Sequence, residues 1–319
     1  MPLVKESGYR PAGIFRNAHA STMIPSLLRK VLAVSYVRER IDTPDGDFID
    51  LDWSAAGGEA VVVICHGLEG SAHRPYVRGM ARTFNRAGFA AVGLNFRGCS
   101  GESNRVLRSY HSGATEDLRT VLDHVCGRGY RRVVLVGFSL GGNLVLKYLG
   151  EDPAGVRPEV AGAVAISSPV DLADGAATIS LPGNRIYSDR FLRKLKRKYR
   201  AKAKLLPGLL DPARLDAVRT LVDFDDLYTA PVHGFRNAAE YYRRCSSRQF
   251  LGNIAVPALL LSARNDPFLG DACYPLAAAE ASDRFHLEIP DHGGHVGFFV
   301  GGGTYFSEAR ALAFVEDLA

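Results

Sequence analysis

A serine between two glycines stands where a nucleophile could be activated. The pentapeptide GFSLG follows the predicted strand RRVVLV directly and opens the helical run LGGNLVLKYLG. A serine held at a sharp turn from strand to helix aims its hydroxyl at the helix N-terminus, where the dipole favours a developing anion. The glycines permit the close approach of strand and helix at such a turn. We therefore predict Ser139 as the nucleophile of an acyl-transfer reaction; the alternative is an inert serine in a glycine-rich turn.

A serine hydroxyl is a weak nucleophile unless a neighbouring base removes its proton. Two histidines follow the late predicted strand FHLEIP, in the sequence DHGGH. We take His295 as the base because its glycine-rich surroundings allow it to reach back to the serine, and His292 is the alternative. Asp266 follows the run PALLLSA and is the predicted acid that orients the base. Asp271 and Asp291 are weaker alternatives for that acid.

The tetrahedral intermediate of acyl transfer needs hydrogen-bond donors aimed at its oxyanion. The first predicted donor is the backbone N–H of Leu140, next to the serine. The second lies in the loop CHGLEG, where we predict the N–H of Leu68, with Glu69 as the fallback. His66 in the same loop is expected to hydrogen-bond within it and to hold the donor, rather than to act as a base.

Short apolar runs alternate with helical segments over most of the chain from residue 60. The predicted strands are 60–65, 90–96, 132–137, 160–167, 258–263 and 285–289, and the predicted helices are 75–86, 115–126, 140–149 and 307–318. This alternation predicts right-handed crossovers and a mostly parallel, doubly wound α/β sheet. The carboxyl ends of parallel strands meet at one edge, so the serine, the aspartate and the histidine are expected to meet there.

The remaining segments suggest how the chain is divided. Residues 35–41 and 48–53 alternate apolar and polar side chains around the turn sequence TPDG, which predicts an antiparallel hairpin. After residue 169 about 85 residues pass before the next buried strand, too many for a plain loop. The predicted units are an irregular N-terminal arm (1–34), a core (35–169 and 255–319) and an inserted helical lid or cap (170–254).

The charge of the chain is concentrated in one segment. The formal net charge is +5, but residues 190–204 hold nine lysines and arginines and no acid, so the rest carries more acidic than basic residues. A nucleic-acid partner is therefore not predicted. The segment also has an apolar stripe, made of Phe191, Leu192, Leu195 and Tyr199. We expect a lid helix packed through that stripe; the alternative is peripheral contact with anionic lipid through Arg190–Lys204.

Other function classes lack their signatures. The five cysteines form no CxxC pair, there is no signal peptide pattern, and no apolar run could span a bilayer. We therefore predict a cytoplasmic protein, with the inner membrane surface as the site of any lipid contact.

No metal or cofactor is predicted, since HExxH is absent and the first buried strand leads into HGLEG instead of GxGxxG. Cys99 has no nearby basic partner in the sequence, and we expect it to be structural.

Several motifs together resemble the YheT-like branch of the α/β-hydrolase superfamily, which includes abhydrolase-domain esterases and lipases. They are NAH at 17–19, HGLEGS at 66–71, NFRGCSG at 95–101, YHSG at 110–113, the elbow at 137–142, NDPF at 265–268 and HGGHVGF at 292–298. The resemblance implies the α/β-hydrolase fold, the same nucleophile, acid and base, and carboxylic esters as substrates. One departure, Ser21 before Thr22 where the family often has Gln, puts a contact of the arm in doubt.

The function these residues predict is hydrolysis of short-to-medium acyl or lipid esters through an acyl-enzyme. Ser139 would attack the ester carbonyl, His295 would move the proton, and Asp266 would hold the imidazole. One alternative is an acyltransferase that uses the same triad with an alcohol or thiol acceptor. Another is a catalytically silent scaffold that binds a partner or membrane. The polar residues of 95–101 and 110–113, with Asp117, are expected to brace loops rather than to react.

Overall fold

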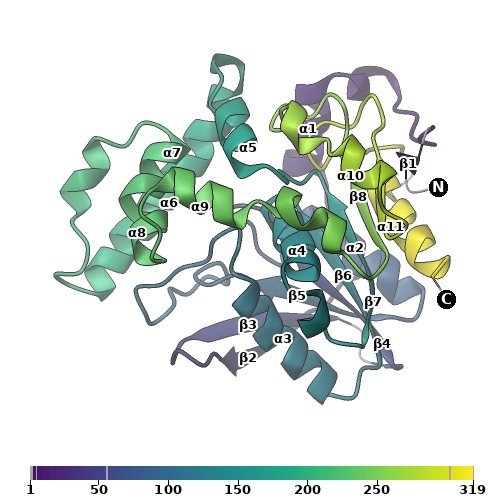
Figure 1. The fold of residues 1–319 in the computed structure, drawn as a ribbon, viewed down its shortest axis with the longest axis horizontal. Coiled ribbons are helices and arrows are strands. Elements are labelled where there is room, and N and C mark those ends of the chain that lie inside the picture. Colours follow the sequence, from purple (N-terminus) through teal and green to yellow (C-terminus); the bar gives the residue numbers. More distant parts are fainter. Residues whose placement is uncertain (1–2, 5, 55–56, 302, 319) are drawn as a thin grey trace.

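The computed structural model describes residues 3–4, 6–54, 57–301 and 303–318. In this part of the chain one sheet of nine strands has the order β1-β9-β8-β7-β6-β4-β5-β3-β2. The strands are β1 (Leu3–Val4), β2 (Val37–Asp42), β3 (Phe48–Ser54), β4 (Ala60–Cys65), β5 (Ala90–Asn95), β6 (Arg132–Phe138), β7 (Val160–Ile166), β8 (Ala258–Leu261) and β9 (Phe285–Glu288). Figure 1 shows the sheet running through the molecule, with both chain ends on the same side.

The sheet is mostly parallel, as the alternating pattern predicts. The first seven strands of the sheet order, β1-β9-β8-β7-β6-β4-β5, pair in parallel with their neighbours. Strand β3 pairs antiparallel with both β5 and β2. The predicted hairpin is thus confirmed as β2 and β3. Its turn closes through the backbone N–H of Thr43, which donates to the carbonyl of Asp47 at 3.0 Å. Gly46 takes a positive φ of 79° there, which glycine adopts without strain.

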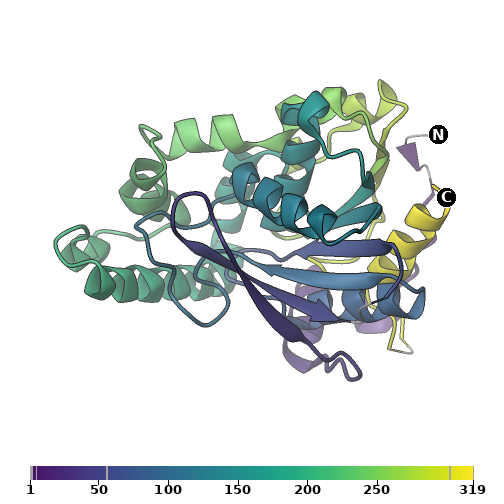
Figure 2. The ribbon, with the colours of Figure 1, turned by 90° about the horizontal axis from the view of Figure 1, so that it is seen from below.

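Helices cover both faces of the sheet, as Figure 2 shows. They are α1 (Ala18–Leu28), α2 (Pro75–Arg86), α3 (Thr115–Gly127), α4 (Leu140–Glu151), α10 (Leu276–Glu280) and α11 (Phe306–Glu316). Side chains of β4 alternate between two hydrophobic cores: Val61 and Val63 pack with α3 and α4, while Val62 and Ile64 pack with α2 and α11. Burial on both faces explains why the strand is a continuous apolar run.

Further helices lie between β7 and β8 in the sequence. They are α5 (Leu172–Ile179), α6 (Arg185–Leu205), α7 (Leu221–Phe224), α8 (Ala230–Val232) and α9 (Ala238–Cys245). Figure 1 shows α6 to α9 together on the side of the sheet away from both chain ends. Helices α6 and α7 share one core, in which Tyr199 and Phe224 are buried, whereas α8 and α9 pack with α5 in a second core that buries Ala230 and Tyr241. No helix among the described residues is long and apolar enough to cross a membrane.

The expectation of an irregular N-terminal arm is wrong in part. Residues 18–28 form α1, which begins where the Asn17 side chain accepts the backbone N–H groups of His19 and Ala20, both at 3.0 Å. Such an N-cap satisfies N–H groups that have no partner within the helix. The short strand β1 is also part of the arm and pairs with β9. Residues 1, 2 and 5 of the predicted arm lie outside the described residues.

Candidate active site

Ser139 lies at the turn between β6 and α4 with a positive φ of 53°. Positive φ is strained for a residue with a side chain and is found mainly where the surrounding structure enforces it. Here the enforcement is steric: a Cβ on Gly137 would collide with the carbonyl of Gly141, and a Cβ on Gly141 would collide with that of Cys65. Both glycines are therefore required for strand and helix to approach this closely, and the predicted strand–turn–helix context of Ser139 is confirmed.

His295 and Asp266 form a hydrogen-bonded pair. The Nδ1 atom of His295 lies 2.9 Å from Oδ2 and 3.1 Å from Oδ1 of Asp266. The carboxylate has no exposed surface, and its Oδ1 also accepts the backbone N–H of Phe268 at 2.9 Å. The Phe268 ring packs on the imidazole with centroids 4.2 Å apart. The imidazole is thus held by a carboxylate at one nitrogen and by an aromatic ring at its face.

The loop that carries His295 is fixed by backbone hydrogen bonds to distant segments. The N–H of His295 donates to Thr22 Oγ1, and that of Val296 donates to Ser167 Oγ, both at 2.9 Å. The sequence reasoning missed Thr22 and Ser167. The departure from the family pattern at Ser21 does not remove the contact between the arm and this loop, because Thr22 makes it. The Ser21 hydroxyl instead donates to the carbonyl of Phe15, within the arm.

The alternatives to the histidine and the aspartate are placed less favourably. The Nδ1 atom of His292 is buried and has no hydrogen-bond partner among the described residues. His292 also does not line either of the cavities that reach Ser139. Asp271 and Asp291 are exposed. The geometry therefore favours His295 and Asp266.

Two cavities meet at the predicted nucleophile. Both are lined by Ser139 and His295, together with Leu68, Phe191 and Phe268. The first cavity extends from Ser139 between the sheet and the inserted helices. The second cavity opens between α1 and α6. The serine and the histidine thus face the same empty space, where an ester could reach both.

The predicted oxyanion donors can be compared with their fallback. The backbone N–H of Glu69 donates to the Tyr110 hydroxyl at 3.0 Å, so the fallback donor is already occupied. The N–H groups of Leu68 and Leu140 have no hydrogen-bond partner within the described part of the chain. Both residues also line the first cavity. Their free N–H groups remain the predicted donors.

His66 hydrogen-bonds within its surroundings, as expected. Its Nδ1 lies 2.7 Å from the carbonyl oxygen of Gly67, and its Nε2 accepts the backbone N–H of Phe96 at 3.2 Å. Complete burial lowers the pKa of His66 to about 3. A neutral imidazole with both nitrogens engaged cannot serve as the base, but it fixes the backbone next to Leu68.

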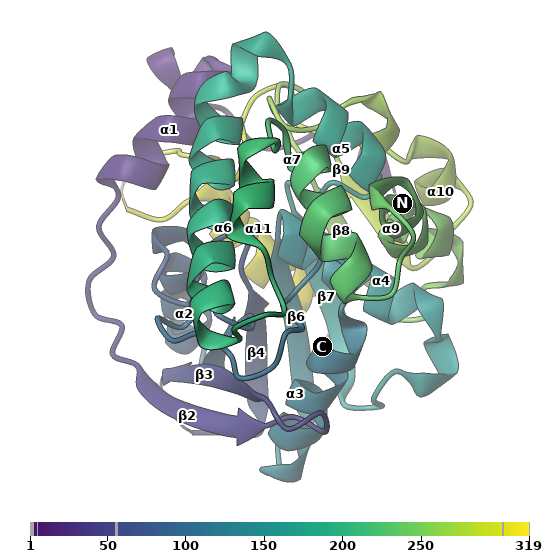
Figure 3. The same cartoon turned by 90° about the vertical axis from the view of Figure 1, so that its left-hand side faces the viewer.

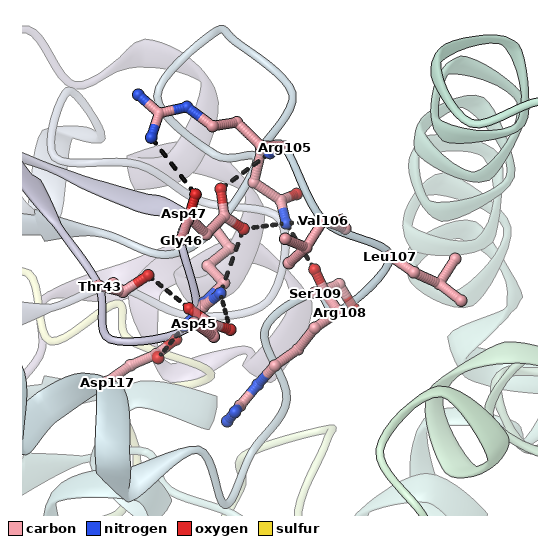
Figure 4. A network of polar contacts seen from close by, with 12 residues as sticks. Thr43, Asp45, Gly46, Asp47, Arg105, Val106, Leu107, Arg108, Ser109 and Asp117 are labelled. Carbon is pink, nitrogen blue, oxygen red and sulfur yellow. Dashed lines mark hydrogen bonds and ion pairs between the residues drawn. The ribbon is translucent and has the colours of Figure 1, made fainter.

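The polar residues after β5 brace loops, as predicted. Arg97 donates to both carboxylate oxygens of Asp117, at 2.8 and 2.6 Å, and to Asp45 at 2.8 Å. Figure 4 shows this network, which also includes Asp47, a carboxylate that accepts from the Asn104 side chain at 2.7 Å. The network joins the β2–β3 turn to the start of α3 and to the loop beneath the inserted helices.

The expectation that no basic group lies near Cys99 is wrong. Lys198 of α6 places its Nζ 2.9 Å from Cys99 Sγ and 2.8 Å from Oε1 of Glu69. Burial raises the pKa of the Cys99 thiol even so, and the lysine is shared with a carboxylate. Cys99 is therefore poorly suited to be a nucleophile. No group of three or more side chains suited to a metal ion occurs among the described residues.

Known proteins of similar sequence and fold show the family to which the chain belongs. Residues 60–302 match the alpha/beta hydrolase fold family. An Escherichia coli K12 protein named "Putative esterase YheT" is 38% identical over 91% of this chain and 86% of its own length. The monoacylglycerol lipase of Saccharomyces cerevisiae is 33% identical over 75% of this chain and 55% of its own length. The esterase Pf2001 of Pyrococcus furiosus, 17% identical, shares the fold with a TM-score of 0.59 over 89% of this chain and 91% of its own.

The sheet order, the turn at Ser139 and the family match define the class of this protein. The chain belongs to the α/β-hydrolase fold family and is a hydrolase. Within that family it belongs to the YheT-like branch, as its sequence motifs indicate.

Proposed function

We propose that Ser139, His295 and Asp266 form a catalytic triad that hydrolyses carboxylic esters through an acyl-enzyme. The observation that carries the proposal is the buried Asp266 carboxylate bonded to His295 Nδ1, on an imidazole that shares two cavities with Ser139. With its proton on Nδ1, the imidazole has a free Nε2 that accepts the serine proton and later returns it to the alcohol. Water then cleaves the acyl-enzyme by the same route.

The oxyanion of the intermediate would be stabilised by the free N–H groups of Leu68 and Leu140. Each such donor contributes about 3 kcal/mol to the transition state in related chemistry. The α4 N-terminus adds a favourable dipole at the same place. Leu140 is the first residue of α4, and Leu68 lies in the turn after β4, near the buried and hydrogen-bonded His66.

Short-to-medium acyl or lipid esters are the proposed substrates. The first cavity is lined near Ser139 by apolar side chains, including Leu140, Pro169, Ile179 and Leu269. Such a lining suits an acyl chain. The curated relatives include proteins named esterase, monoacylglycerol lipase and phospholipase. We propose that residues 170–254 act as a lid, because Phe191 and Leu195 of α6 line this cavity together with Ser139.

Contact with a membrane surface is a further part of the proposal. The exposed side chains of Arg193 and Arg197 lie on α6, and two apolar side chains, Leu27 of α1 and Ile186 of α6, are each 59% exposed. Each basic residue near anionic lipid contributes about 1 kcal/mol to binding. A cytoplasmic location, at the inner membrane surface when bound, is proposed with it. Sedimentation with phosphatidylserine vesicles at low salt tests this contact, and no binding would exclude it.

A panel of p-nitrophenyl esters of increasing chain length tests the esterase function. Wild-type protein is expected to release p-nitrophenol, and Ser139→Ala to fall to the background rate. Equal rates for both proteins would refute the proposal. Added alcohols separate the two triad reactions: a hydrolase yields mainly free acid, whereas a transferase yields mainly the new ester.

A further inference from the structure

The second cavity is lined by an unusual number of positive charges. It opens between α1 and α6, which lie side by side in Figure 3 and are joined by His19 Nδ1 and Tyr187 Oη at 3.0 Å. Its cationic lining residues are Arg29, Arg74, Arg190, Arg193 and Lys194, and no aspartate or glutamate lines it. Ser139 and His295 stand at its inner end.

Most of these cations have no carboxylate partner. Arg29 is neutralised by a buried ion pair with Glu308. The other four form no ion pair with any described residue. The Nζ of Lys194 donates only to a backbone carbonyl, that of Glu69, at 3.2 Å. Burial, and after it the positive charge of Arg74, lower the pKa of Lys194.

Two cations that line the first cavity do have carboxylate partners. Lys198 there is paired with Glu69, and Arg97 is surrounded by three carboxylates. A third cation of that cavity, Lys202, has no ion pair, but its Nζ donates to Asn104 Oδ1 and to the carbonyls of Asn104 and Val106, each at 2.7 Å. Four cations without a carboxylate partner therefore line the second cavity, against one in the first. Like charges gathered in a partly buried site repel each other, and an anion bound among them relieves that repulsion.

We propose that the substrate ester carries an anionic phosphate on its alcohol portion, which Arg74 and Lys194 bind in the second cavity. The acyl chain then occupies the apolar first cavity, and the ester carbonyl lies at Ser139 where the two meet. Arginine offers a planar fork that matches phosphate oxygens, and lysine supplies a point charge. Arg190 and Arg193, which are more exposed, would attract the anion to the entrance.

This inference rests on the proposed esterase function and extends it to a substrate class. The phosphate could belong to a soluble alcohol or to a lipid headgroup. A butyryl ester of glycerol 3-phosphate, assayed below its aggregation concentration, presents the phosphate without any membrane. The matched neutral substrate is 1-butyrylglycerol, which has the same acyl chain and reacting bond. A decanoyl pair in vesicles extends the comparison to lipid.

Wild-type protein is expected to hydrolyse the phosphorylated butyryl ester with a kcat/KM at least ~10-fold above that of the neutral ester, as befits one or two charge-assisted hydrogen bonds. Arg74→Gln and Lys194→Gln should each reduce this preference by about 10-fold, mainly through a higher KM for the phosphorylated ester. Preference confined to the decanoyl pair in vesicles would overturn the cavity site in favour of binding to the membrane surface.

Arg185→Gln is the matched control, since Arg185 is an exposed cation of α6 that does not line the cavity and lies outside the proposed lipid-contact segment. It should retain the wild-type preference. Equal kcat/KM for both butyryl esters, with Ser139-dependent turnover of each, would overturn this inference and leave the esterase function intact. Absence of any Ser139-dependent turnover would refute both.

Discussion

The hydroxyl oxygen of Thr22 lies 2.9 Å from the backbone nitrogen of His295, although 273 positions separate the two residues. This hydrogen bond ties α1 to the loop that carries the proposed base. A Cβ on Gly297 in that loop would collide with the backbone of Ser21. The N-terminal arm therefore acts as a support for the site, and α1 fixes the backbone of the residue that carries the imidazole.

Thr22→Val is expected to lower kcat about 5- to 10-fold, because a buried N–H that loses its acceptor costs about 1–1.5 kcal/mol in positioning. KM should change less, since Thr22 holds the base rather than the ester. Ester hydrolysis kinetics measure the effect. The control is Ser26→Ala, because Ser26 lies on the same helix as Thr22 and both line the second cavity. This variant should keep kcat within about twofold of wild type. Equal losses of kcat in both variants would show that Thr22 has no specific role.

Asp266→Asn is expected to reduce kcat by about 10³- to 10⁴-fold, because an amide can favour the wrong tautomer of His295 and cannot stabilise the imidazolium. The thermal midpoint should change little, which circular dichroism can check. Asp271→Asn removes an exposed carboxylate on the same loop and should retain near-wild-type activity. A fully active Asp266→Asn would exclude this carboxylate from the mechanism.

The glycines of the elbow should be intolerant of a methyl group. A Cβ on Gly142 would overlap the Ser168 hydroxyl, so Gly142→Ala should lower the free energy of unfolding by about 1–3 kcal/mol. Gly127 lies in α3 with open space around it, and Gly127→Ala should be neutral or stabilise by up to about 1 kcal/mol. Urea unfolding compares the two; similar midpoints would contradict the steric account of the elbow.

His66 should make the protein sensitive to acid. Burial lowers its pKa in the folded state to about 3, whereas an unfolded chain binds the proton below about pH 6.5. The unfolded state therefore binds more protons between these values, and stability from this group is present above pH 6.5 and lost as the pH falls toward 3. Urea midpoints measured from pH 7 to 4 should fall less steeply in His66→Gln than in wild type. An equally steep decline would mean that another group causes the acid sensitivity.

The elbow could be predicted because its signal is local. Apolar strand, glycine-flanked serine and helix follow each other directly, and the predicted elements 60–65 and 75–86 coincide with β4 and α2. The acid and the base could be placed at one sheet edge because parallel strands end there together. Reach from a glycine-flanked loop favours His295 over His292, and a position at the end of a strand favours Asp266 over Asp271. The contacts of the structure favour the same residues.

Contacts between distant segments could not be predicted from one sequence. Thr22 and Ser167 act through hydrogen bonds that only the tertiary fold creates, and Lys198 meets Cys99 across 99 positions. Helix α1 could not be predicted because its segment has no clear apolar period and has glycines and prolines around it. Tertiary packing and the Asn17 cap stabilise a helix there that local propensity alone does not indicate.

Labelling with a fluorophosphonate probe tests the central claim most directly, because such probes phosphonylate only an activated serine. Wild-type protein should gain one label within minutes, which peptide mass spectrometry should place on Ser139. Ser139→Ala should gain none, and Asp266→Asn should react far more slowly. Labelling of Ser139→Ala at the wild-type rate, or a label located on another residue of the wild-type chain, would contradict the account.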